Sequence, residues 1–168
     1  MRFLAFFCAL FLFSSLYGEE LPDILKASYK GDLTSVKKHI ASGSDLNLRS
    51  DNGATPMVTA ATFGHTTIVE ALVKAGAKID LKDNQGSTAL HCAAFFCHPK
   101  MVKVLLESGA DKNLRNKAGS TPLDSVKGPF EEVKPIYEFI EKLLTPFGLD
   151  LDYERMEKER PNITNLLL

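Results

Sequence analysis

The sequence lacks any strong excess of charge, which bears on the partners it can bind. Its 168 residues include 20 Lys and Arg against 21 Asp and Glu, a formal net charge of −1 with no basic stripe. Because nucleic-acid phosphates are bound by clustered Lys and Arg, we expect no nucleic-acid partner. The hydrophobic content of 45% and the charged content of 24% are ordinary for a soluble globular protein.

Sequence signatures of catalysis are also missing. We find no nucleophile elbow, phosphate-binding loop, paired-carboxylate site or zinc-protease helix. The four histidines all map onto predicted turns or helix faces. The sequence therefore predicts neither an enzyme nor a protein that carries a cofactor.

Long hydrophobic runs are scarce. The run from Phe3 to Leu16 contains no charged residue, and it is shorter than the roughly 20 residues that span a bilayer. Arg2 precedes it and small residues lead to Gly18, which is the layout of a secretory signal peptide over residues 1–18. An uncleaved membrane anchor is the alternative. We expect an exported protein, periplasmic or extracellular, with no membrane attachment once the signal peptide is cleaved.

Cysteine is rare, with three residues in the chain, and Cys8 lies inside the apolar run. Export would place Cys92 and Cys97 in a compartment that permits disulfides. A bridge between them is one interpretation. Residues five apart on a helix point about 140° apart, so the helix would have to end before Cys97. Free buried thiols and a redox role are the alternatives.

What the sequence does contain is an internal repeat with a spacing of 33 residues. Its opening tetrapeptide is Thr55-Pro56-Met57-Val58, then Thr88-Ala89-Leu90-His91, then Thr121-Pro122-Leu123-Asp124. Other positions keep the same spacing, namely Gly53, Gly86 and Gly119, and the pairs Ala60-Ala61 and Ala93-Ala94. A fixed period of this length predicts stacked helix pairs, each too thin to bury a core alone.

Each unit carries signals for two helices. In the unit that begins at Gly53, Thr55 is a suitable N-cap and Pro56 suits the first helical position. A second helix follows from about Thr67, and residues 77–86 form a polar β-turn finger. We place the units at about 19–52, 53–85, 86–118 and a truncated 119–126. Residues 127–168 are predicted to form a helical cap over the last repeat, with its helix starting in earnest near Pro135.

These residues resemble the ankyrin repeat, through the Thr-Pro-Leu-His-like opening, the paired alanines and the Gly64-His65 turn. The tail resembles the end of some exported bacterial ankyrin-repeat proteins. The resemblance implies an all-α solenoid of about four helix–turn–helix units with β-turn fingers and a C-terminal helical cap. It also implies structural roles for Thr55, Thr88, His91 and Thr121, with the His91 imidazole bonded to the opening threonine. Since His98 also falls at a structural turn position, we expect no metal at the His91, Cys92, Cys97 and His98 cluster.

Members of this family mostly bind other proteins, through the concave groove and the finger tips. The resemblance therefore points to candidate contacts in the fingers, which are Arg49, Asn52, Lys82, Asn84, Gln85, Arg115 and Lys117. Arg49, Lys82 and Arg115 share one register, which favours an acidic partner, although Asp51 and Asp83 nearby weaken the positive field. Solvated turns without a binding role are the alternative for the finger residues. On the groove the candidates are Phe63, Phe95 and Phe96, for which packing between repeats is the alternative.

The sequence thus predicts an exported, monomeric ankyrin-repeat protein that binds another protein. Two alternatives remain from the sequence. One is a secreted inhibitor or immunity-type protein that blocks an enzyme. The other is an envelope thiol or oxidative-stress protein that uses Cys92 and Cys97.

Overall fold

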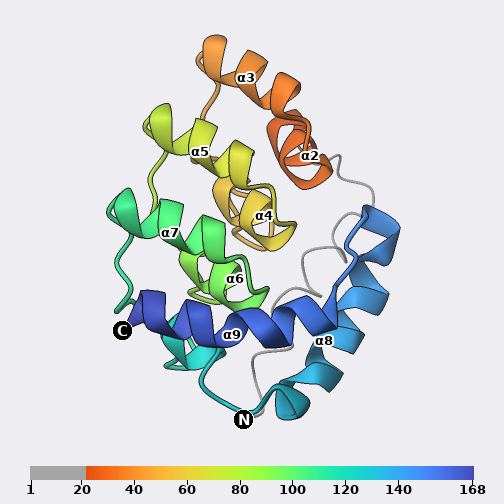
Figure 1. Ribbon diagram of the computed structural model, residues 1–168. Coiled ribbons are helices and arrows are strands. Elements are labelled where there is room, and N and C mark those ends of the chain that lie inside the picture. The colour runs from red at the N-terminus through yellow and green to blue at the C-terminus, as the bar shows by residue number, and fades with distance from the viewer. Residues whose placement is uncertain (1–21) are drawn as a thin grey trace.

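The computed structural model describes residues 22–168 (Figure 1), and the signal peptide predicted for residues 1–18 lies outside this part. Within the described residues every regular element is a helix. The repeat region contains α2 (Asp23–Lys30), α3 (Leu33–Ala41), α4 (Pro56–Thr62), α5 (Thr66–Lys74), α6 (Ala89–Phe95) and α7 (Pro99–Glu107). The predicted all-α repeat fold is therefore confirmed.

The helices form two layers, because each helix packs on its counterpart in the next repeat. The first helices α2, α4 and α6 stack on one another, and the second helices α3, α5 and α7 form a parallel row beside them (Figure 1). The paired alanines that recur with the repeat, Ala60-Ala61 and Ala93-Ala94, lie on α4 and α6 and are fully buried. Their small side chains let neighbouring helices approach closely, so the hydrophobic core runs unbroken through the stack.

Helix starts follow the sequence signals. The Val58 N–H donates to Thr55 Oγ1 (3.3 Å), and Pro56 occupies the first position of α4. Gly64 lies in the turn between α4 and α5 and has a φ of +77°. A Cβ at this position would lie 2.9 Å from Cε1 of His98. In the next repeat Cys97 takes the equivalent place with φ +55°, a conformation that disfavours non-glycine residues. The turn geometry is thus kept even where the glycine is not.

The fourth unit stops early. Its opening at Thr121 leads into a short 3₁₀ helix, η2 (Leu123–Ser125), and the chain then turns at Gly128. Helix α8 (Phe130–Leu144) begins directly after this turn, so the expectation that it starts near Pro135 is wrong. Pro135 is tolerated inside the helix. Because it has no N–H, the carbonyl of Glu131 lacks its helical hydrogen bond, but Glu131 is exposed and water can bind there instead.

The C-terminal extension consists of α8, η3 (Thr145–Phe147) and α9 (Tyr153–Leu167). Helix α9 lies against α7 and η2, at the end of the stack (Figure 1). Helix α8 instead runs back along the stack, and η3 brings the Phe147 ring to 6.1 Å from the ring of Tyr29 in α2. The extension thus touches both the first and the last complete repeats. No helix within residues 22–168 is both long and apolar enough to cross a membrane.

Candidate protein-binding surface

In each finger between repeats, the oxygen of one side chain accepts at least one hydrogen bond from a backbone N–H group and so fixes the turn. In the second finger Oδ1 of Asp83 accepts hydrogen bonds from the N–H groups of Gln85 and Ser87, both at 2.8 Å. Burial raises the pKa of the Asp83 carboxyl, although these N–H bonds act in the opposite direction. Sequence reasoning missed this structural role of Asp83. A side chain of the same shape, Asp or Asn, recurs one period apart at positions 83 and 116, and this could have indicated the role.

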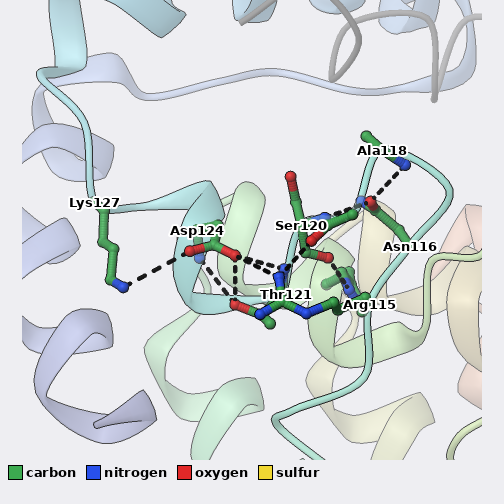
Figure 2. Close-up of polar contacts among 9 residues, drawn as sticks. Arg115, Asn116, Ala118, Ser120, Thr121, Asp124 and Lys127 are labelled. Carbon is green, nitrogen blue, oxygen red and sulfur yellow. Dashed lines mark hydrogen bonds and ion pairs between the residues drawn. The ribbon is translucent and has the colours of Figure 1, made fainter.

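The third finger repeats the arrangement with an amide (Figure 2). Oδ1 of Asn116 accepts hydrogen bonds from the N–H groups of Ala118 and Ser120, both at 3.0 Å. In the first finger the aligned residue is Ser50, whose side chain is shorter. There Oδ1 of Asn52 accepts from the Ala54 N–H (3.2 Å), so this candidate contact residue also orders its own turn.

Neighbouring fingers are joined by hydrogen bonds between their tips. The Asn84 N–H donates to the Asn52 carbonyl (2.9 Å), and Nδ2 of Asn84 donates to the Asp51 carbonyl (2.7 Å). One repeat further on, the Lys117 N–H donates to the Gln85 carbonyl (2.8 Å). The three fingers therefore form one ordered row, which we call the finger edge and define as residues 49–54, 82–87 and 115–120.

The three cations predicted to share a register do not play equal parts. Arg49 is exposed, whereas Lys82 is half-buried and its Nζ donates to the Arg115 carbonyl (3.1 Å). The Arg115 side chain is 66% exposed, donates to the Gly119 carbonyl (2.6 Å) and lies 4.0 Å from a carboxylate oxygen of Asp124. Lys82 thus links the second and third fingers by a hydrogen bond, while Arg49 and Arg115 remain accessible at the surface.

Asp124 organises the start of the truncated unit (Figure 2). Its carboxylate accepts hydrogen bonds from the N–H and the hydroxyl of Thr121, both at 2.8 Å, and it pairs with Lys127 at 3.7 Å. The N–H of Thr121 is the main reason that the pKa of Asp124 lies below its usual value. Thr121 therefore has a structural partner, in keeping with the role that the family resemblance implies.

His91 connects the start of its own helix, α6, to the third finger. Its Nδ1 lies 2.9 Å from Oγ1 of Thr88 and 3.2 Å from the Thr88 nitrogen, and its Nε2 lies 3.1 Å from the Ser120 carbonyl. Since the carbonyl can only accept, Nε2 carries the proton and Nδ1 accepts from Thr88. Burial lowers the pKa of His91, which favours this neutral form. The bond to the opening threonine is the one that the family resemblance implies.

The aromatic candidates on the groove are mostly unavailable. Phe95 is 6% exposed and Phe96 is fully buried, so their prediction as surface contacts is wrong. Helix α8 covers this position, since the Tyr137 ring lies 4.7 Å from that of Phe95 and the Tyr137 hydroxyl donates to the Phe95 carbonyl (2.7 Å). Phe63 is half-buried, with its ring 5.9 Å from that of Tyr29.

The two described cysteines are free thiols, so the predicted possibility of a Cys92–Cys97 disulfide is not realised. Cys92 lies on α6 and Cys97 in the turn that follows it, and both are buried. Burial raises the pKa of Cys92 to about 12 and that of Cys97 to about 11. Near neutral pH neither supplies a reactive thiolate, which argues against the thiol-protein hypothesis.

Stacked helix pairs with an ordered row of fingers define a repeat protein of the solenoid class, in which each unit contacts only its neighbours. The family model described as Ankyrin repeats (3 copies) matches residues 24–116, which is more than half of the chain. The protein belongs to the ankyrin-repeat family. Ankyrin repeats generally mediate protein–protein interaction and are typically non-enzymatic scaffolds. No curated protein was found to match the chain.

Proposed function

We propose that this protein is exported and, as a monomer, binds another protein through the finger edge. The observation that carries the proposal is the set of hydrogen bonds between neighbouring finger tips, from Asn84 to the first finger and from Lys117 to the second. Because these tips are ordered before any partner arrives, little conformational entropy is lost on docking. A surface of this kind suits recognition by shape and hydrogen bonding rather than catalysis.

We favour the finger edge over the opposite end of the groove, where the first helices α2 and α6 end. At that opposite end the C-terminal extension already covers these helices, with Tyr137 on Phe95 and Phe147 beside Tyr29. A partner would have to displace these contacts and expose apolar rings to reach the same place. The finger edge requires no such opening, so it is the surface on which we place the contact.

The chemistry of the edge suggests a partner with an acidic patch. Arg49, Arg115 and Lys117 are exposed along it, and Asp51 and Asn84 alternate with them as exposed polar groups. Cations separated by a carboxylate give a moderate positive field, so hydrogen bonding rather than bulk attraction would set specificity.

A charge-reversal pair tests the proposal. We expect Arg49→Glu with Lys117→Glu to weaken binding of the native partner by about tenfold or more, because two attractive contacts become repulsive. The matched control is Lys37→Glu with Lys74→Glu, which makes the same charge change on the exposed outer helices. Binding would be measured by calorimetry on the partner captured from the protein's own cellular compartment, with circular dichroism to verify the fold.

Equal loss in both double variants would contradict the placement on the finger edge. A tight one-to-one complex that abolishes an enzyme's activity would favour the inhibitor hypothesis over an adaptor with several partners. Export is tested separately by mass spectrometry of the native protein. A mature chain beginning near residue 19 supports it, and an intact N-terminus in the cytoplasm contradicts it.

A further inference from the structure

A surface hollow of about 350 Å³ lies between the loop that follows η2 and one face of α9. Its apolar wall is formed by Val126, Phe130 and Pro161. Its rim carries polar groups from α9, including Glu157 and Asn165. The hollow lies outside the family's repeats, since the matched repeats end at residue 116.

At this hollow lies Arg160, the charged residue that is buried within the described part of the chain. It is 5% exposed, and its guanidinium carbon lies 5.8 Å from the centre of the Phe130 ring. Burying a cation is costly unless an anion or several hydrogen bonds compensate it. The nature of its partners therefore decides whether the site is complete.

The hydrogen-bond acceptors of Arg160 within residues 22–168 are all neutral. Its Nη2 donates to the Gly128 carbonyl (2.8 Å), and its Nη1 lies 3.4 Å from both the Ser125 carbonyl and the Tyr137 hydroxyl. None of the ion pairs formed by the described residues includes Arg160. A guanidinium has five N–H donors, whereas these contacts involve two of its nitrogens and no ion pair within the described residues compensates its charge.

We propose that the hollow binds a monocarboxylate attached to a small apolar group, with the carboxylate on Arg160. Guanidinium and carboxylate match as paired hydrogen-bonding groups, and Val126, Phe130 and Pro161 supply apolar contact for the attached group. Glu157 at the rim disfavours a second negative charge on the ligand. The carboxylate belongs either to a free amino or organic acid or to the C-terminus of a peptide. This site is independent of the finger edge and of the function proposed for it.

An NMR titration of the full mature chain tests the proposal with defined probes. N-acetyl-leucine represents a peptide C-terminus, leucine represents a free amino acid, and N-acetyl-leucinamide is the matched probe without a carboxylate. We expect saturable amide shifts in residues 126–130 and 157–165 with one or both carboxylates, and the tighter of the two identifies the source. No saturable shift with either carboxylate, or equal binding of the amide, would overturn the proposal.

Variants at the hollow separate ligand binding from folding. Arg160→Gln should abolish the shifts, but this buried side chain also supports the fold. The deciding variant is therefore Asn165→Asp, an exposed rim position where a new negative charge should weaken carboxylate binding about threefold or more. Asn162→Asp, an exposed position of α9 outside the hollow, is the control and should bind normally. Unchanged affinity in Asn165→Asp, or an equal loss in both variants, would contradict the proposal that the carboxylate binds in this hollow.

Discussion

At the scale of single residues, His98 has the largest consequence for pH dependence. It opens α7 and lies in the turn that begins at Cys97, whose carbonyl accepts a hydrogen bond from Nη1 of Arg155 (2.7 Å). Burial is the main reason that the pKa of His98 is lowered to about 4, and the positive charge of Arg155 acts in the same direction. The folded protein therefore favours the neutral ring over a range in which the unfolded chain already binds a proton.

The direction of the resulting pH effect follows from linkage. Above the ordinary histidine pKa of 6.5, His98 is neutral in both the folded and the unfolded state, so its titration does not affect stability. As the pH falls from about 6.5 to about 4, only the unfolded state gains the proton, so the free energy of unfolding falls by up to about 3 kcal/mol. We expect His98→Gln to show a shallower fall across this window, measured by urea unfolding at several pH values. Identical pH profiles for the two proteins would contradict the prediction.

Residue-scale features were the most accessible to sequence analysis. Thr55, Pro56 and the paired alanines were placed correctly because caps, turns and inter-repeat contacts depend on residues a few positions or one period away. Phe95 was misjudged because the group that covers it, Tyr137, comes 42 residues later and outside the repeat. No periodic signal relates α8 to α6, so its docking could not be predicted from the repeat.

At the scale of elements, α8 is held to the stack by a buried polar clamp. The Tyr137 hydroxyl donates to the Phe95 carbonyl and also lies within 3.4 Å of Nη1 of Arg160, which belongs to α9. One hydroxyl therefore connects three helices in a place that water does not reach. The apolar neighbours Ile140 and Leu144 on the same helix complete the contact.

Removing this hydroxyl should destabilise the protein without changing its shape. We expect Tyr137→Phe to lower the free energy of unfolding by about 1–3 kcal/mol, because the Phe95 carbonyl loses its hydroxyl donor. The control is Phe139→Ala on the same helix, whose ring is 51% exposed and whose loss should matter little. Both would be measured by urea unfolding with the m-value checked. An effect of Tyr137→Phe no larger than that of the control would show that the clamp contributes nothing.

At the scale of the whole molecule, the second helix of the first repeat is less buried than the second helices of the later repeats. In α3 only Val36 is fully buried, whereas α7 buries Met101, Val102 and Leu105 and lies under α9. Since solenoid units are stabilised only by their neighbours, the repeat with less covered surface should open first. The architecture itself was predictable from the repeat, but this gradient depends on where the extension packs.

Native-state hydrogen exchange should reveal the gradient. We expect amides of α3 to exchange about tenfold or more faster than those of α7, with α5 between them. The measurement uses the intact chain without denaturant, so no variant is needed. Uniform protection across the three helices would mean that the stack opens as one unit and would rule out stepwise loss of the first repeat.

The bonds that join the fingers have a consequence for how new specificities can arise in this chain. Apart from Nδ2 of Asn84 and Nζ of Lys82, the contacts between tips use main-chain atoms, which every amino acid except proline supplies in full. Exposed side chains such as those of Arg49 and Lys117 can therefore be substituted without breaking the hydrogen bonds between fingers. Natural selection or a designed library can change them one at a time, and so change binding specificity, while the backbone keeps its geometry.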